Sequence, residues 1–475
     1  MNRNNFGIHF LIAAILIVLA AILGQLDRWQ KSLKSNPPPP FLSKHKPANT
    51  PKSISGNQSA SPEVLVKFKP GVSLKEITKI AAERNDRVED EIESVNGLVA
   101  IDDLDNASAA TVAREYQTLN NLVVYAEPVF EISLDDPDSV KKVNPTTNNR
   151  FSGAPNDPEF DEQWGLSNTG QNGGKPQADI KALKAWENSR GSSDVVVAVL
   201  DTGIDYTHPD LIENMWVRPE SLQPYQDDEL GTIDDLHGFD AVNAADPMDD
   251  NGHGTHVAGI IGAVGDNGIG IAGINWHVKL LPLKFLGRNG SGTTKDAIEA
   301  INYAIERKKQ GVNIRVINAS WGSTQRSQAL EDAIRSAADA GILFVAAAGN
   351  NSSNNDNSPH FPSNYNLPNL ISVSATDRND RLAGFSNFGQ KTVHVAAPGR
   401  EIVSTWLNGE YREASGTSMA APFVSGVAAL IIASEPEVEL KELRDRILSS
   451  ADKIEGLKDL VSSNGRLDAL KALNK

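Results

Sequence analysis

VVVAVLDTGID occupies residues 195–205 and joins an uninterrupted apolar run to a turn that contains aspartate. A strand buried on both faces reads as a continuous apolar run, whereas a half-buried strand alternates. Similar runs follow along the chain, at residues 278–286, 314–320, 341–349, 370–375 and 393–397. Helical spacing lies among and after them, at residues 254–264, 292–309, 328–340, 418–433 and 438–449. This alternation predicts an α/β fold with a mostly parallel sheet flanked by helices.

The region before this sheet predicts a separate small domain at residues 63–133. Apolar strand patterns lie at 64–68, 97–101 and 122–132, and helical spacing lies at 74–82 and 108–119. Their β-α-β-α-β order is typical of a small α+β domain of the ferredoxin-like kind. The segments on either side, 35–62 and 134–156, are rich in Pro, Ser and Asn and are expected to be linkers. The large domain then covers 157–475.

The first 34 residues predict a signal peptide or a membrane anchor. Residues 10–23 are uninterruptedly apolar, and a possible anchor would extend over 8–26. The charges conflict with export, because Arg28 and two lysines follow the run while only Arg3 and the amino terminus precede it. We nevertheless expect an extracellular or cell-surface protein, for a reason given below.

Composition excludes several classes of function. The chain has 475 residues, a formal net charge of -16 and no cysteine. Acidic charge spread along the chain argues against nucleic acid as a partner. Thiol catalysis, disulfides and cysteine-ligated zinc sites are excluded because there is no cysteine.

Four residues of chemical interest lie at the junctions of predicted elements: Asp201, His253, Asn350 and Ser418. Each alone has an ordinary structural interpretation, as a turn former, a packed histidine or a helix cap. Together they supply what nucleophilic catalysis by serine needs, namely a base, an orienting carboxylate and an oxyanion donor. Since the carboxyl ends of parallel strands meet at one edge of a sheet, we expect the four residues to lie together.

Two alternatives concern neighbouring residues. EASGTSMAAP (413–422) holds a second serine, Ser415, and by itself does not say which serine is the nucleophile. His253 and His256 are three residues apart, whereas the zinc motif H-E-x-x-H has histidines four apart and a glutamate base. We therefore expect His256 to be a packed helix residue and not a metal ligand.

The motifs DTGID, HGTHVAG, AAAGN and GTSMAAP resemble those of the subtilisin-like serine proteases, in that family's order of Asp, His, Asn and Ser. The resemblance covers residues 157–470. It implies that Ser418 is the nucleophile, His253 the base, Asp201 the group that orients it and Asn350 the oxyanion donor. The small domain resembles the family's inhibitory propeptide. The resemblance thus implies a zymogen that cuts itself within 133–156, and this suits export.

The resemblance also implies a substrate site and a calcium site. The substrate would lie along the backbone of six residues: Ser320, Trp321, Gly322, Ala347, Ala348 and Gly349. Trp321 and Phe361 suggest an apolar pocket, with His360 near its floor. The Ca²⁺ ligands would be Asp157, Asp210, Gly265, Asn267, Ile269 and Ile271, the glycine and isoleucines through their carbonyls. The acidic run 227–250 is either a second ion site or a solvated loop.

Two other functions remain open. A catalytically silent peptide-binding protein would keep this fold, although the presence of all four residues argues against it. A lipase or esterase would have G-x-S-x-G and the order Ser, Asp, His. Here Ala420 replaces the second glycine and the order is reversed. The preferred hypothesis is a serine endopeptidase acting on proteins or peptides.

Overall fold

The computed structural model describes residues 63–134, 140–143, 154–227 and 230–474, all within one compact unit that begins at residue 60. The predicted leader and the linker before residue 63 lie outside the described residues. So does the predicted anchor at residues 8–26. Their assignments remain predictions.

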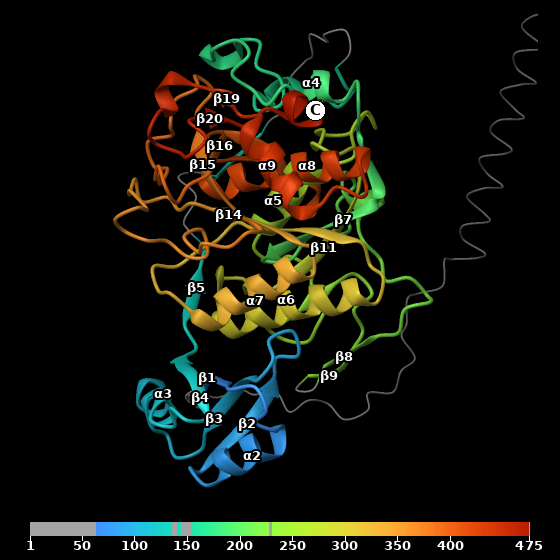
Figure 1. The fold of residues 1–475 in the computed structure, drawn as a ribbon. Coiled ribbons are helices and arrows are strands. Elements are labelled where there is room, and N and C mark those ends of the chain that lie inside the picture. Colours follow the sequence, from blue (N-terminus) through green and yellow to red (C-terminus); the bar gives the residue numbers. More distant parts are fainter. Residues whose placement is uncertain (1–62, 135–139, 144–153, 228–229, 475) are drawn as a thin grey trace, which may run out of the picture. The chain divides into compact units, whose positions relative to one another are not determined.

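A nine-stranded sheet forms the centre of the large domain (Figure 1). Its strand order is β10-β11-β7-β13-β14-β15-β16-β20-β19, and every pair is parallel except β19 and β20. The strands are β7 (Gly191–Asp201), β10 (Phe239–Asp240), β11 (His277–Lys284), β13 (Ile314–Ala319), β14 (Leu343–Ala347), β15 (Leu370–Thr376), β16 (Val395–Pro398), β19 (Asp452–Lys453) and β20 (Gly465–Arg466). The predicted mostly parallel sheet is confirmed.

Helices cover both faces of this sheet. α5 (His253–Gly262) and α8 (Thr417–Ser434) pack together on one face, and α6 (Thr294–Lys309) and α7 (Gln328–Asp339) pack together on the other (Figure 1). The apolar run of β7 is continuous because both faces of the strand are buried. Val197 and Val199 lie in the core that contains α5 and α8, whereas Val196 and Ala198 lie in the core that contains α6 and α7. Further helices are α4 (Ala182–Ala185), α9 (Leu440–Ser449) and α10 (Ala469–Leu473).

The small domain has four antiparallel strands in the order β2-β3-β1-β4, with helices α2 and α3. The elements are β1 (Glu63–Phe68), α2 (Leu74–Ala82), β2 (Asp86–Glu91), β3 (Leu98–Asp103), α3 (Ala109–Gln117) and β4 (Val123–Pro128). The α+β prediction is confirmed, but β2 was missed. Its sequence, DRVEDE, is charged and lacks the apolar alternation of a half-buried strand.

A second missed feature is the hairpin of β17 (Ile402–Trp406) and β18 (Glu410–Ala414), directly before the serine motif. Its turn places Asn408 and Gly409 at φ 62° and 72°. An Asn-Gly pair between strand patterns is a strong hairpin signal, so the sequence did contain the information. β6 (Val140–Lys142) extends this hairpin to three strands.

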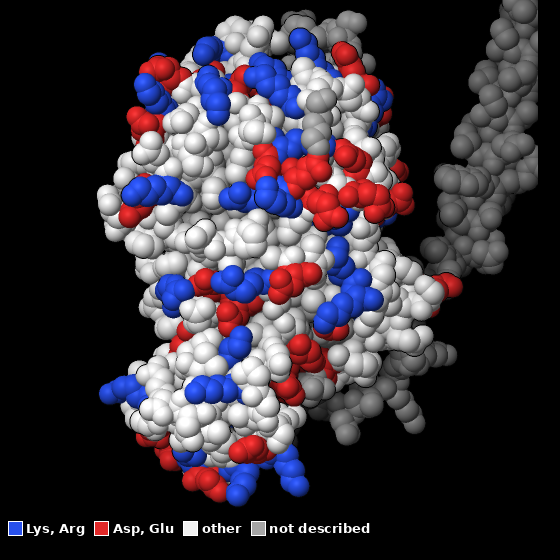
Figure 2. All heavy atoms as spheres, viewed as in Figure 1, with Lys and Arg blue, Asp and Glu red and all other residues white. Residues whose placement is uncertain are grey.

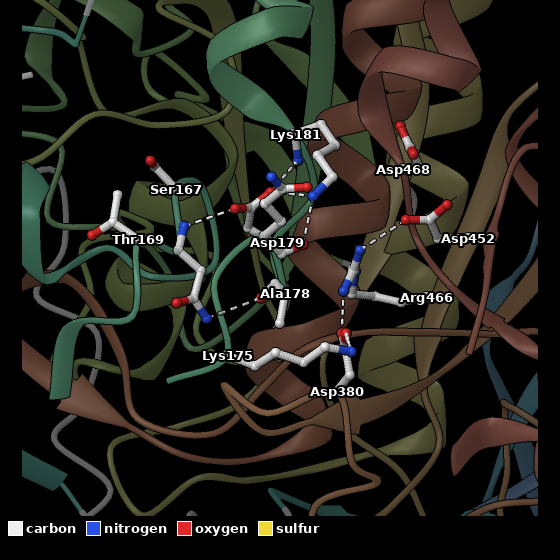
Figure 3. Close-up of polar contacts among 12 residues, drawn as sticks. Ser167, Thr169, Lys175, Ala178, Asp179, Lys181, Asp380, Asp452, Arg466 and Asp468 are labelled. Carbon is white, nitrogen blue, oxygen red and sulfur yellow. Dashed lines mark hydrogen bonds and ion pairs between the residues drawn. The ribbon is translucent and has the colours of Figure 1, made fainter. Parts of the chain in front are cut away.

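Ion pairs around the buried Arg466 and Asp380 tie the two ends of the large domain together (Figure 3). Arg466 of β20 is 1% exposed, forms an ion pair with Asp380 and lies 3.1 Å from Asp452. Lys175, from the start of the domain, lies 3.0 Å from the same Asp380. On the molecular face shown in Figure 2, acidic and basic side chains are intermixed.

One described helix, α8, is long and apolar enough to span a membrane. It is 89% buried inside the protein and packs against β7, β13 and β15, so it is the core helix of the sheet.

Candidate active site

Asp201 and His253 are brought together by the first strand and the first helix of the sheet. Asp201 is the last residue of β7, and His253 opens α5. His253 Nδ1 lies 2.7 Å from Asp201 Oδ1, and both side chains are almost completely buried. Asp201 thus fixes the ring orientation and favours a proton on Nδ1, which leaves Nε2 as the basic nitrogen.

Asp249 holds the start of α5 in place, a role that the sequence analysis missed. Its carboxylate accepts hydrogen bonds from the backbone N–H of Gly252 at 3.0 Å and of Thr255 at 2.9 Å. It also accepts from the hydroxyls of Thr202 and Thr255. Because Gly252, the residue at the N-cap position, has no side chain, an acidic residue three positions earlier takes over the cap. That spacing is the signal that was available in the sequence.

Ser418 is the second residue of α8 and lies beside the end of β13. Its hydroxyl donates to the carbonyl of Ser320 at 2.9 Å, and the Ser320 hydroxyl donates back to the carbonyl of Ser418 at 2.8 Å. Ser415, the other serine of the motif, accepts a hydrogen bond from the backbone N–H of Glu401. Ser415 therefore has a structural partner in the preceding turn.

Asn350 follows β14 and is coupled to α8. Its Oδ1 accepts from the backbone N–H of Thr417 at 2.9 Å and from the Thr417 hydroxyl at 3.0 Å. These contacts fix the amide so that Nδ2 faces the backbone beside the serine, where a Cβ on Gly416 would be 3.2 Å away. Nδ2 is buried and has no hydrogen-bond acceptor among the described residues. A buried, fixed donor of this kind is suited to an oxyanion.

The four residues thus reach one edge of the sheet from neighbouring strands. Asp201 ends β7, and the partner of Ser418 follows β13. Asn350 follows β14. β7, β13 and β14 are adjacent in the sheet. A serine, a histidine with an orienting carboxylate, and a fixed amide donor are the groups that acyl transfer requires.

His256 is a packed residue, as predicted. Its Nε2 donates to the carbonyls of Arg412 at 3.0 Å and Ile402 at 3.2 Å, and burial lowers its pKa to about 3. The ring thus holds two strands of the hairpin region against α5. It does not face the same site as His253, so the zinc interpretation has no support.

A strand from the end of the small domain lies along the predicted substrate edge. β5 (Glu131–Ser133) pairs antiparallel with β12 (Ser291–Thr293), and Ser133 also pairs with Gly322. The backbone N–H of Leu134 donates to the carbonyl of Gly290 at 2.9 Å. An extended segment therefore occupies the groove between β12 and the residues after β13.

The side chain of Trp321 does not line the predicted pocket. Trp321 is 0% exposed, packs against Phe285 and donates its indole N–H to the carbonyl of Leu200. Its side chain belongs to the core, so the prediction of an apolar pocket lined by Trp321 is wrong. Ala347 and Ala348 are also fully buried, and Ser320 and Gly349 hold the serine motif through hydrogen bonds.

Five of the six residues predicted to bind calcium are linked by hydrogen bonds, namely Asp157, Asp210, Asn267, Ile269 and Ile271, and Gly265 begins the same loop. Asp157 accepts from the backbone N–H of Asp266 and Asn267, which fixes the loop 265–271. Asn267 Nδ2 donates to Asp210 at 2.8 Å, and the N–H of Ile271 donates to it at 3.0 Å. Burial raises the pKa of Asp157 to about 6 and that of Asp210 to about 7. Two carboxylates are thus buried close together without a basic partner in these contacts.

The acidic run 227–250 serves structural roles in its described part, residues 227 and 230–250. Asp235 is fully buried and pairs with Arg307 at 2.6 Å and Arg218 at 3.0 Å. Asp250 pairs with Lys284, and Asp249 caps α5. These side chains are committed to basic partners and backbone donors, so the second ion site is not supported there.

Comparison with known proteins agrees with this geometry. Residues 192–467 match the Peptidase_S8 family, the subtilase family. The thermophilic serine proteinase of Bacillus sp. (strain AK1) is 38% identical over 407 residues, which cover 83% of each chain. The cell wall-associated protease of Bacillus subtilis (strain 168) is 36% identical over 352 residues, or 73% of this chain and 34% of that protein.

A solved structure shares the fold. Fervidolysin from Fervidobacterium pennivorans, described as a keratinolytic enzyme related to subtilisin, superposes with a TM-score of 0.68 at 25% identity. The match covers 89% of this chain and 62% of that one. Sequence and fold therefore agree, and the chain belongs to the subtilase family and is a serine-type endopeptidase.

Proposed function

We propose that this endopeptidase is made as a self-processing zymogen and hydrolyses peptide bonds through an acyl-enzyme. Ser418 is the nucleophile, His253 the base and Asp201 the group that holds the ring. The observation that carries the proposal is β5, which runs from the small domain into the groove between β12 and Gly322. An inhibitory segment that must also be the first substrate would have this placement.

The reaction follows from these contacts. Ser418 leaves the carbonyl of Ser320 and adds its oxygen to the substrate carbonyl carbon, while His253 Nε2 takes the hydroxyl proton. The new imidazolium is stabilised by Asp201 at 2.7 Å. His253 then gives this proton to the departing amine nitrogen, and the C–N bond breaks. Water hydrolyses the ester by the same proton transfers in reverse order.

Asn350 stabilises the negative charge that develops on the carbonyl oxygen. Its Nδ2 is buried and already oriented by Thr417, so it needs no reorganisation during the reaction. The N-terminus of α8 contributes a positive potential at the same place.

Residues 63–133 act as an intramolecular inhibitor. Glu127 accepts hydrogen bonds from the Ser327 hydroxyl at 2.6 Å and from the N–H of Gln328 at 2.9 Å, at the start of α7. Lys67 pairs with Asp332 on the same helix at 2.6 Å. These contacts hold the small domain against the large one and hold β5 in the groove.

Calcium fits the loop around Asp210. Glu159 Oε2 is buried and has no hydrogen-bond partner in the described part of the chain, and burial raises the pKa of Glu159 as well as those of Asp157 and Asp210. Among the described residues, no backbone N–H donates to the carbonyls of Gly265, Ile269 or Ile271. Carboxylate, amide and carbonyl oxygens suit Ca²⁺. Asp157, Asp210, Asn267 and these carbonyls would hold it, and the ion would stabilise the loop.

The remaining parts of the proposal concern location. A self-processing zymogen suits an extracellular or cell-surface enzyme, and residues 8–26 would anchor it or be removed with the leader. N-terminal sequencing of the purified mature protein tests both the leader and the processing site.

Ser418→Ala in the full chain tests the mechanism. The variant is expected to remain unprocessed and inactive, whereas Ser415→Ala, the matched control, matures. Self-maturation of the Ser418→Ala protein would overturn the proposal. A catalytically silent binding protein is the second candidate, and failure of a fluorophosphonate to label processed wild-type protein would favour it.

A further inference from the structure

Lys284, the last residue of β11, has an almost completely buried ammonium group. The residue is 4% exposed, and its Nζ donates to three oxygens. These are the carbonyl of Thr202 at 2.7 Å, the carbonyl of Leu286 at 3.1 Å and Oδ1 of Asp250 at 2.8 Å. A lysine ammonium has three N–H donors, so each of them has a partner. Because burying an unpaired cation is costly, these partners are what allow Lys284 to stay charged at this place.

The first of these contacts holds the turn that carries Asp201. Lys284 lies opposite Asp201 in the parallel pairing of β11 with β7. The carbonyl of Asp201 accepts from the backbone N–H of Phe285 at 3.1 Å and of Leu286 at 3.2 Å. The carbonyl of the next residue, Thr202, accepts from the Lys284 ammonium. The end of β11 thus fixes two consecutive carbonyls at the end of β7.

The contact with Asp250 reaches the loop that leads into α5. Asp250 lies three residues before His253, and its carboxylate is 2.8 Å from the Lys284 ammonium. Thr202 connects the same two segments, because its hydroxyl donates at 2.9 Å to Asp249, the residue that caps α5. The ammonium group therefore joins the turn after β7 to the loop before α5.

The Asp201–His253 pair lies between the two segments that are joined in this way. His253 Nδ1 is 2.7 Å from Asp201, and a displacement of about 1 Å in such a site can cost about 10²-fold in rate. A buried cation beside the pair also makes protonation of the imidazole less favourable. Since His253 must be neutral to act as a base, such a charge extends its activity toward lower pH.

We propose that Lys284 is a positioning residue for catalysis. Its ammonium clamps the turn after Asp201 to the loop before His253, and it supplies a positive charge beside the pair. This inference rests on the proposed function of the same site. It adds a fourth side chain to the one carboxylate, one imidazole and one hydroxyl that carry out the reaction, and this side chain touches neither substrate nor reacting atoms.

Other ionisable groups surround the pair and Lys284. Burial raises the pKa of Asp240 on β10, and the charge of Lys284 opposes that shift. Burial lowers the pKa of His256 to about 3, so this ring is neutral while His253 titrates. The ionisable residues on the elements packed against the pair are Asp201, Asp205, Asp249, Asp250, His256 and Arg412. The two substitutions below each change one member of a single ion pair, so opposite effects of the two report the charge of that pair.

Lys284→Met keeps a long buried side chain but removes the charge and the three hydrogen bonds. In mature enzyme, kcat is expected to fall by about 10- to 100-fold with little change in KM, because the reacting groups are misplaced while the substrate groove is untouched. The acid limb of kcat/KM is expected to move to higher pH by about 0.5 unit, because the imidazole loses a neighbouring cation. Lys279→Met is the matched control. Lys279 is on the same strand, donates to the carbonyl of Glu213 at the surface, and is expected to keep the wild-type values.

Asp250→Asn makes the opposite change in charge at a side chain that is 51% exposed, so this variant is expected to fold even where Lys284→Met does not. The amide oxygen of asparagine can still accept from the ammonium, and kcat is expected to change far less than in Lys284→Met. The acid limb of kcat/KM is expected to move to lower pH, because a neighbouring negative charge is lost. A contact that only maintains the fold would leave the acid limb in place in both variants.

The concentration of active enzyme is set by fluorophosphonate titration in each case. An unchanged kcat in titrated Lys284→Met would overturn the proposal, and so would acid limbs that move in the same direction in the two variants. An acid limb at the wild-type pH in Asp250→Asn would overturn it even if Lys284→Met gave no folded enzyme. If the wild-type protein cleaves no peptide and takes no fluorophosphonate, the proposed function itself fails, which is a distinguishable result.

Discussion

His253 Nδ1 lies 2.7 Å from Asp201 Oδ1, although 52 residues separate the two along the chain. The contact is made by the end of β7 and the start of α5, and both ends are fixed: β7 by the sheet and α5 by Asp249. The ring of His253 is therefore oriented before any substrate binds, so the entropy of orienting it does not have to be lost during the reaction.

Asp201→Asn is the first prediction. Asparagine keeps the shape but can stabilise the wrong tautomer of His253, so kcat is expected to fall by about 10⁴. The measurement is kcat on a peptide substrate, together with the rate of self-processing of the full chain. Asp205→Asn, a buried aspartate four residues later, is the control and is expected to change kcat far less. Equal losses in both variants would indicate a general folding defect.

Asn350→Ala is the second prediction. It removes the buried donor, and kcat is expected to fall by about 10²–10³ with little change in KM, the range measured on removing one such donor in subtilisin. Asn351→Ala, at the exposed neighbouring position, should stay close to wild type. An effect confined to KM would show that Asn350 binds substrate in its ground state and does not stabilise the oxyanion.

The sequence allowed the sheet and the places of the four residues at the ends of its elements to be predicted, because both depend on local signals. Doubly buried strands are continuous apolar runs, and the chemistry lies at their ends. The place of Trp321, in contrast, depends on which neighbour its side chain meets. A tryptophan next to a predicted substrate edge gives no sign of facing the core, where Leu200 accepts its indole N–H.

His360 illustrates the same limit. The sequence placed it near a pocket floor but could not show that its ring lies between Gly322 and Gly349. That arrangement depends on the loop after β14 folding back over the strand ends, a long-range contact with no local pattern. β2 was missed for another reason: its charged residues, which include the buried Asp86 and Asp90, leave no apolar strand period in the sequence.

Arg466→Met is the third prediction. Loss of this 1% exposed guanidinium leaves the buried Asp380 with Lys175 as its ion-pair partner, and the Lys175 side chain is exposed. The free energy of unfolding is therefore expected to fall by about 3–5 kcal/mol. Denaturant unfolding in the inactive Ser418→Ala background avoids self-digestion. Lys441→Met, in an exposed pair with Asp445 on α9, should cost less than about 1 kcal/mol. Similar losses in the two variants would rule out a special role for the buried cluster.

Calcium binding is the fourth prediction. A ligand present at 100 times its dissociation constant stabilises the native state by about 2.7 kcal/mol, so a chelator should lower the unfolding temperature. Asp210→Asn removes one of the buried carboxylates and should make the unfolding temperature independent of chelator. Asp266→Asn, an exposed carboxylate of the same loop that is not among the six proposed ligands, should keep the response. A wild-type protein indifferent to chelation would remove the support for this site.

The last prediction concerns the pH dependence of propeptide release. At the contact between the small domain and α6, Lys295 lies 3.1 Å from Glu63 and 3.0 Å from Glu89. Burial raises the pKa of Glu63 to about 7, and burial together with the nearby Asp90 raises the pKa of Glu299 well above its ordinary value. After separation these carboxyls return to water, where the pKa of a glutamate is about 4.3.

The direction of the effect follows from this difference. Glu63 and Glu299 bind more protons in the contact than after separation, so their contribution is fully present below about pH 4.3. The contribution of Glu63 is lost as pH rises through about 7, and that of Glu299 is lost as pH rises through its own raised pKa. The pKa of Glu89 is lowered, so its contribution is lost only as pH falls below its ordinary range and does not act between pH 6 and pH 8. The processed propeptide should therefore leave faster at pH 8 than at pH 6, measured as the rate at which peptidase activity appears. Glu299→Gln removes one ionisable group and should flatten that profile, whereas Glu306→Gln, on the same helix and paired with Lys309, should not. Release that slows as pH rises would show that the ion pairs of Lys295 outweigh the buried carboxylates.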